Sequence, residues 1–71
     1  MLEMDFLFKN NTDKFRKKIE KIFEKCRPFS VEESGGNVKF TFGRHNYDKK
    51  AVRRASDFPR RIFRYALFRR T

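Results

Sequence analysis

The chain has 71 residues, with 19 Lys and Arg against 9 Asp and Glu, and its apolar residues include 10 Phe. A chain of this length builds only one hydrophobic core, which excludes a second independent domain and predicts a single compact domain over residues 1–71. One Cys and one His exclude an internal disulfide and are too few for a structural zinc site. We therefore expect neither a metal nor another cofactor.

The N-terminal segment and the hydropathy of the chain indicate where the protein resides. Glu3 and Asp5 lie in a segment in which a secretory signal peptide carries positive charge. No apolar run approaches the roughly 20 residues that cross a membrane, and Cys26 has no second cysteine to pair with. These features predict an intracellular protein in a reducing compartment, without a signal peptide or a transmembrane segment.

The first elements in chain order are a strand and a helix. Apolar residues recur at every second position over residues 2–8, which predicts a strand with one buried face. The spacing then becomes helical, with Asn11 and Thr12 as candidate capping residues and Pro28 as the stop. The apolar face of this helix comprises Phe15, Ile19, Ile22, Phe23 and Cys26.

The later elements follow from turn and capping residues. Two alternating runs on either side of Gly35 and Gly36 predict an antiparallel hairpin over residues 29–42. Asp48 can cap a second helix, and apolar residues continue in helical register through residues 58–70, with a kink or split near Pro59. The expected fold is α+β in β-α-β-β-α order, a short antiparallel sheet with helices on one face.

The distribution of charge indicates the contact region. Residues 1–43 hold nine basic and seven acidic side chains, whereas residues 44–71 hold ten basic and two acidic. Because like charges at this density repel one another, a partner that neutralises them is expected, and arginine offers a planar fork for phosphate. The basic helical region 48–70 is therefore predicted to contact nucleic-acid phosphates through an arginine-rich face.

The predicted contact residues form two groups. The first group shares the basic helical face, on which one aromatic ring is placed to stack: Lys49, Lys50, Arg53, Arg54, Arg60, Arg61, Arg64 and Phe68. Arg44, Asn46 and Tyr47 form a loop suited to reading bases, because Asn pairs with adenine, Arg pairs with guanine and Tyr stacks. An ordinary polar turn is an equal interpretation of this loop. The choice between DNA and RNA stays open.

The first helix offers a second set of basic residues. Its lysines alternate with acids at helical spacing, so we expect ion pairs that partly neutralise this face: Asp13 with Lys17, Arg16 with Glu20, and Lys21 with Glu24. A solvated face is the favoured interpretation, and an auxiliary track for phosphates is the alternative. The open face of the sheet would carry charges of both signs, unlike a nucleic-acid platform.

Two other partners are compatible with the basic region. A protein-binding regulator or inhibitor would dock its basic and aromatic residues on an acidic partner protein, with Tyr47 and Phe68 as anchors. A membrane surface would suit residues 58–70 as an isolated amphipathic helix. That second interpretation needs apolar residues that so small a domain requires for its core. The oligomeric state is not predicted.

Catalysis is not expected. His45 can act as a base near neutral pH, which is the minimum for a metal-independent ribonuclease. The order of helix, hairpin and helix, with one histidine near the sheet, is similar to that of small toxin ribonucleases built on the double-stranded-RNA-binding fold. Residues 48–55 resemble the lysine-rich start of the last helix in that binding domain. The resemblance lies in topology, and no motif around His45 supports catalysis, so the interpretation as an exposed loop histidine is favoured.

Overall fold

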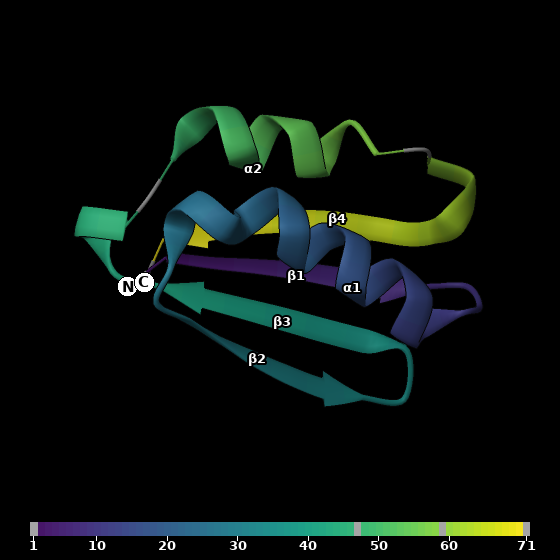
Figure 1. The fold of residues 1–71 in the computed structure, drawn as a ribbon. Coiled ribbons are helices and arrows are strands. Elements are labelled where there is room, and N and C mark those ends of the chain that lie inside the picture. The colour runs from purple at the N-terminus through teal and green to yellow at the C-terminus, as the bar shows by residue number, and fades with distance from the viewer. Residues whose placement is uncertain (1, 47, 59, 71) are drawn as a thin grey trace.

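The computed structural model describes residues 2–46, 48–58 and 60–70, and at position 60 only the backbone. The strands and helices follow one another in the order β-α-β-β-α-β (Figure 1). In order they are β1 (Leu2–Phe8), α1 (Thr12–Ile22), β2 (Phe29–Ser34), β3 (Asn37–Phe42), α2 (Lys49–Ser56) and β4 (Phe63–Arg70), joined in part by the 3-10 turns η1 (Phe23–Cys26), η2 (Arg44–Asn46) and η3 (Arg60–Ile62).

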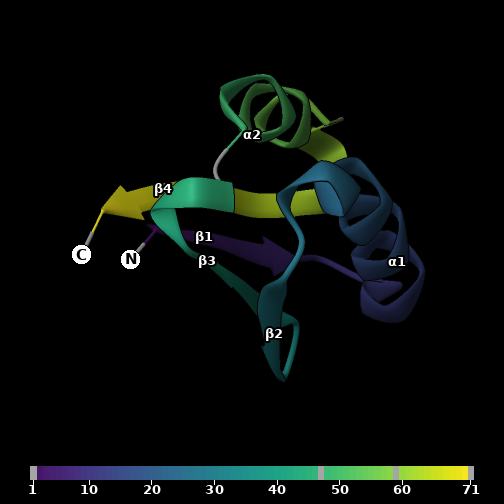
Figure 2. The same ribbon diagram turned by 60° about the vertical axis from the view of Figure 1, so that its left-hand side comes forward.

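The four strands form one antiparallel sheet in the order β2-β3-β1-β4. Both helices cover the same face of this sheet and leave the other face open, as the turned view in Figure 2 shows. The α+β class, the antiparallel sheet and the placement of the helices on one face are therefore confirmed. With β1 and β3 in the middle, the arrangement is the split β-α-β topology of ferredoxin-like domains, which is compatible with many functions.

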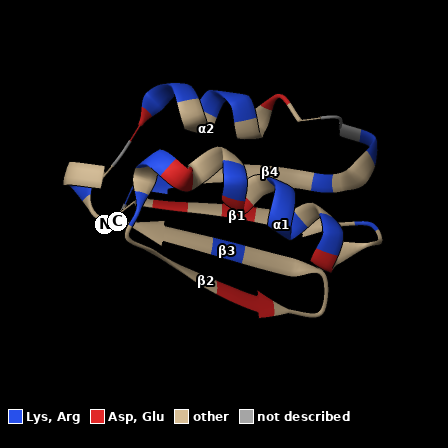
Figure 3. Ribbon diagram, viewed as in Figure 1, with Lys and Arg blue, Asp and Glu red and all other residues tan. Residues whose placement is uncertain are grey.

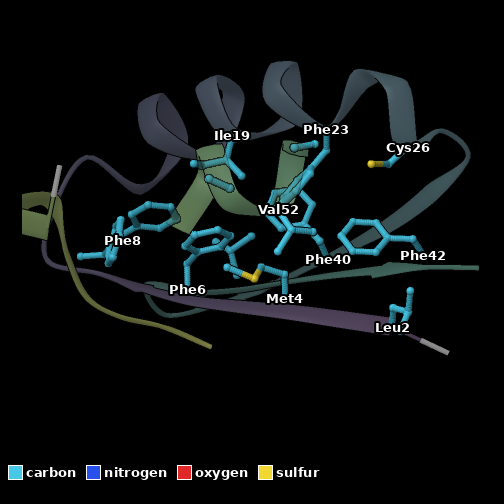
Figure 4. Packing of buried hydrophobic residues seen from close by; sticks show 14 residues of the cluster. Leu2, Met4, Phe6, Phe8, Ile19, Phe23, Cys26, Phe40, Phe42 and Val52 are labelled. Atoms are coloured by element: carbon cyan, nitrogen blue, oxygen red, sulfur yellow. The ribbon is translucent and has the colours of Figure 1, made fainter. Parts of the chain in front are cut away.

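The core lies between the sheet and the helices, and phenylalanine is its most frequent residue (Figure 4). The alternation predicted for β1 turns Phe6 and Phe8 toward the helices, where both are buried. Phe23 packs edge-on against Phe40 and Phe42, with ring centroids 5.1 and 5.0 Å apart. Such aromatic pairs stabilise a core by about 0.5–1.5 kcal/mol each beyond the area they bury. The large rings thus let a short chain hold a sheet and two helices together.

The predicted first helix is present but changes its geometry before it ends. Asn11 stands at its N-cap with φ of 51°, and its side chain forms no capping hydrogen bond. After Ile22 the chain tightens into the 3-10 turn η1, which still turns Phe23 and Cys26 into the core. The apolar spacing therefore predicts which side chains are buried more accurately than it predicts the type of helix.

The hairpin prediction over residues 29–42 is confirmed. Ser34 pairs with Asn37 across a turn formed by Gly35 and Gly36. These glycines have φ of 53° and 85°, which lies in the left-handed region that other residues rarely adopt. The turn therefore sets the register that places alternate residues of β2 and β3 on the core side.

The prediction of a last helix over residues 58–70 is wrong. After η3, β4 pairs with the whole length of β1, from Leu2↔Arg70 to Phe8↔Phe63. Four consecutive apolar residues at 65–68 fit a helix and a strand equally well, and a register shift between Leu7 and Phe8 interrupts the alternation. Pairing with β1 decides the outcome, because β1 would otherwise leave one edge without hydrogen-bond partners.

The helix, hairpin and helix on which the resemblance to the small toxin ribonucleases was based are present as α1, β2–β3 and α2, and β4 follows them and joins the sheet beside β1. The kink expected at Pro59 lies outside the described residues.

Candidate nucleic-acid interface

The second helix presents its basic residues because its apolar residues occupy the opposite side. Asp48 caps the helix, since its carboxylate accepts a hydrogen bond of 3.0 Å from the backbone N–H of Lys50. Ala51, Val52 and Ala55 are buried against the core. The four basic residues of the helix, Lys49, Lys50, Arg53 and Arg54, are exposed, and the helix contains no acid. The predicted cap and the predicted basic face of α2 are thus both present.

Arg16 forms three ion pairs from the first helix. Its guanidinium lies 3.0 Å from Glu20, 3.0 Å from Glu33 of β2 and 3.9 Å from Asp13. The predicted pair with Glu20 is confirmed, whereas the structure records no ion pair for Lys17 or Lys21 with any described residue. The predicted pairs of these two lysines are therefore wrong, and Asp13, expected at Lys17, lies against Arg16 instead.

A groove of about 550 Å³ separates the two helices. Basic residues form both of its walls, with Lys18, Lys21 and Lys25 from the α1 side and Lys50 and Arg54 from α2. Its apolar lining comes from Ile22, Ala51 and Phe58, and its two acids are Glu24 and Asp48, of which Asp48 is engaged in capping α2. Figure 3 shows Lys and Arg along both helices. We call this feature the interhelical groove.

The loop between β3 and α2 holds the residues predicted to read bases. Arg44 and His45 are exposed in η2, and the structure records no ion pair for Arg44 with the described residues. The side-chain amide of Asn46 donates a hydrogen bond of 3.4 Å to the backbone carbonyl of Pro28. Tyr47 lies outside the described residues. Asn46 is thus engaged in holding the loop, whereas Arg44 is exposed and open to a ligand.

The C-terminal arginines do not share one face, because the helix that would align them is absent. Arg61 is exposed in η3, and Arg64 of β4 lines a separate depression of about 470 Å³ with Lys9 and Ser56. The side chain of Arg60 lies outside the described residues. Phe68 pairs across the sheet with Met4 and packs against the core. The prediction that Phe68 shares a basic helical face with Arg60, Arg61 and Arg64 is therefore wrong.

The open face of the sheet is largely neutralised by its own charges. Arg69 forms an ion pair with the buried carboxylate of Asp5, and the amine of Lys39 lies 3.6 Å from Glu32. β4 adds Tyr65 and Leu67 to this face, with 42% and 47% of their surface exposed. One exposed aromatic ring among paired charges is a poor platform for a polyanion. The helical layer is the better candidate.

Sequence reasoning favoured the α2 side of the interhelical groove and kept the α1 lysines only as an alternative, an auxiliary track for phosphates. Lys18, Lys21 and Lys25 flank the apolar face of the first helix at spacings of three and four, which is a detectable signal. Their meeting with Lys50 and Arg54 depends on how the two helices pack on the sheet. That packing is a property of the tertiary structure, and the spacing of residues within either helix does not predict it.

Comparison with known proteins adds no relative, since no family model, curated protein or solved structure matches the chain. Within the part of the chain that the structure describes, no helix has the length and apolar character needed to cross a membrane. The same residues contain no cluster of three or more His, Cys, Asp or Glu that could hold a metal ion. Function must therefore be argued from the surface itself.

Proposed function

We propose that this protein binds nucleic acid by contacting its phosphates with the basic surface of the helical layer. The observation that carries the proposal is that α2, with four exposed cations and no acid, faces lysines of the α1 side across one groove. A polyanion neutralises such a field and releases its own counterions, which favours binding. The proposal keeps the predicted partner and the predicted contacts of α2, and replaces the contacts predicted at residues 60–68 with lysines of the first helix.

The chemistry of these residues determines the expected mode of binding. Lysine and arginine contacts to phosphate fix position without reading sequence, so affinity should be strong at low salt and depend little on base identity. Arg44, at the end of the sheet near the start of α2, is the residue placed to add a contact with a guanine edge. The partner is a nucleic acid without a required sequence.

The rival partners find less support in this arrangement. The amphipathic helix that a membrane-surface interpretation needs is not formed, because residues 63–70 are a strand. The largest exposed apolar side chains of the described residues, Tyr65 and Leu67, lie on the open face of the sheet, away from the basic helices. An acidic partner protein would use the same basic surface, so it becomes an alternative outcome of the test below.

Fluorescence anisotropy of labelled oligonucleotides, titrated from low to physiological salt, tests the proposal. Duplex DNA, duplex RNA and single strands are compared for the wild type and for Lys49→Ala/Arg53→Ala/Arg54→Ala. Loss of each phosphate contact should reduce the slope of log affinity against log salt by about one. We expect the triple variant to bind all probes more weakly and with a shallower slope.

Lys39→Ala is the control for the single α2 variant Arg53→Ala, since it also removes one cation but from the open face of the sheet, without touching the helices. Lys39→Ala should keep the wild-type salt slope. Absence of binding to every probe at low salt would contradict the proposal and favour an acidic partner protein. Equal effects of Lys39→Ala and of a single α2 substitution would show attraction by net charge alone.

A further inference from the structure

The interhelical groove differs from the rest of the basic surface because cations face it from two sides. Lys18, Lys21 and Lys25 stand on one wall, and Lys50 and Arg54 stand on the other. A ligand inside the groove is therefore approached by positive charge from both helices. A ligand resting on top of the helices meets a different set of cations, represented by the exposed Lys17 and Arg53, which do not line the groove.

The lining of the groove adds a second requirement for the ligand. Ile22, Ala51 and Phe58 are apolar, and Phe58 packs edge-on against Phe15 with ring centroids 6.4 Å apart. A purely ionic ligand gains nothing from such a floor, whereas a base or a sugar has an apolar face that can cover it. Only a strand with unpaired bases offers phosphates and open base faces together, because a duplex keeps its bases stacked and paired.

The volume of the groove agrees with one strand. At about 550 Å³ it lies within the range of sites that enclose a single small ligand, which is about 300–1,000 Å³. A duplex is a convex rod with its phosphates on the outside, so it would rest on the outer residues of both helices. The groove and the outer surface therefore select different forms of nucleic acid.

We infer that the interhelical groove is a binding site for single-stranded nucleic acid, with phosphates held between the lysines of α1 and the Lys50 and Arg54 side chains of α2, and with a base or sugar against Ile22, Ala51 and Phe58. This inference rests on the proposed function and names its substrate class. RNA and DNA share the chemistry that the groove recognises, so both are included in the test.

Two double variants, matched in charge and in helix, separate the groove from the outer surface. Lys21→Ala/Arg54→Ala removes one lysine of α1 and one arginine of α2 from the groove. Lys17→Ala/Arg53→Ala removes one lysine of α1 and one arginine of α2 from outside it. All four side chains are exposed, so both variants should fold, which circular dichroism and thermal unfolding of each variant verify.

The probes are labelled oligo-dT and oligo-U of about 12 nucleotides, within the site sizes of single-strand modules, and a DNA duplex of the same length. At low salt the groove variant should bind both single strands about tenfold or more weakly than the outer variant does, since each lost charged hydrogen bond costs at least about 1.5 kcal/mol. For the duplex, the outer variant should lose at least as much affinity as the groove variant. The comparison of oligo-dT with oligo-U measures the combined effect of the 2′-hydroxyl and of the thymine methyl group.

The results distinguish this inference from the proposal on which it rests. If the wild type binds none of the probes, both are overturned. If the wild type binds but the two variants weaken single strands equally, the groove assignment is overturned and the proposed function stands. A selective loss of single-strand binding in the groove variant supports the inference.

Discussion

Gly36 is the residue at which the hairpin turn meets the end of β1. Its backbone carbonyl accepts a hydrogen bond of 2.9 Å from the N–H of Phe8, and a Cβ added to Gly36 would lie 3.1 Å from the Phe8 carbonyl oxygen. Gly35, its neighbour, has open space around the corresponding position. Both glycines have a positive φ, so a substitution at either position strains the backbone. Only a substitution at Gly36 adds a steric contact, so a comparison of the two measures the cost of that contact.

Gly36→Ala should destabilise the protein more than Gly35→Ala does. The alanine at 35 is strained only by its left-handed backbone, which costs about 1–2 kcal/mol, whereas the alanine at 36 also presses on the backbone of Phe8. Urea unfolding of both variants measures the difference in the free energy of unfolding. Equal losses would show that the contact with Phe8 has no energetic weight.

Asp5 is a buried acid on the open face of the sheet, where only 4% of its surface is exposed. Its carboxylate pairs with the guanidinium of Arg69 on β4. Arg69→Ala should lower the free energy of unfolding by about 1–3 kcal/mol, because it leaves a buried carboxylate without its partner. Arg70→Ala is the control, since Arg70 is exposed on the same strand. Chemical denaturation of both variants gives the comparison, and equal stability would argue against a role for the pair.

Cys26 is buried among the aromatic rings, and burial raises the pKa of its thiol above the ordinary value of 9.0. The thiolate is the reactive form, so a thiol reagent should modify the folded protein far more slowly than the urea-unfolded chain. As the unfolded chain releases this proton more readily, stability that is present below pH 9.0 should fall as the pH rises above it. Rapid labelling of the folded protein would contradict this placement of Cys26.

At the scale of elements, neighbouring residues of β4 lie on opposite faces of the sheet, one facing the core and the other facing solvent. Phe68 faces the core, whereas Leu67 lies on the open face with 47% of its surface exposed. Phe68→Ala should therefore lower the free energy of unfolding by about 2–3 kcal/mol, somewhat below the range for a fully buried Phe. Leu67→Ala should cost less than about 1 kcal/mol. Thermal or urea unfolding checks both values.

The reverse order of these two losses would restore the helical interpretation of residues 58–70, in which Phe68 is exposed. Cross-strand NMR contacts between Met4 and Phe68 provide an independent measurement, because these residues are opposite each other only in a strand pair.

The elements that the sequence predicts correctly are those with local signals. The alternation in β1, the glycine turn and the Asp48 cap each lie within a few residues of the structure that they determine. β4 has no such local signal, because its partner strand is at the other end of the chain. The same distinction applies to the candidate site. Helical spacing predicts the exposed cations of α2, but it does not predict that they lie near Lys21, because that depends on how the helices pack.

The ion pairs of Arg16 show a similar limit. Helical spacing correctly predicts the pair with Glu20. It misses Glu33, because that acid comes from β2 and reaches Arg16 only when the strand lies beneath α1. The charge on this side of the first helix therefore depends on tertiary structure, because β2 adds an acid that a count of charges within the helix omits.

At the scale of the whole molecule, positive charge is concentrated in the helical layer, while the open face of the sheet carries charges of both signs. The lysines of α1 and the basic residues of α2 repel one another across the interhelical groove. Added salt should therefore raise the thermal unfolding midpoint, because it screens this repulsion over about 8–10 Å near physiological ionic strength. Unfolding scans from low to physiological salt measure the shift.

The Lys21→Ala/Arg54→Ala variant should show a smaller salt effect than the wild type, because one cation has been removed from each wall of the groove. A midpoint that falls with salt would instead mean that the ion pairs of Arg16 and Arg69 dominate the electrostatic contribution to stability.

The position of β1 has a consequence for synthesis of the protein in the cell. β1 is made first, yet it lies between β3 and β4, so its second neighbour is not available until residues 63–70 have been translated. Until then the nascent chain exposes an unpaired edge of a strand rich in phenylalanine, which is the kind of surface that chaperones recognise and that aggregates in their absence. We expect chains cut short before β4 to accumulate in the insoluble fraction.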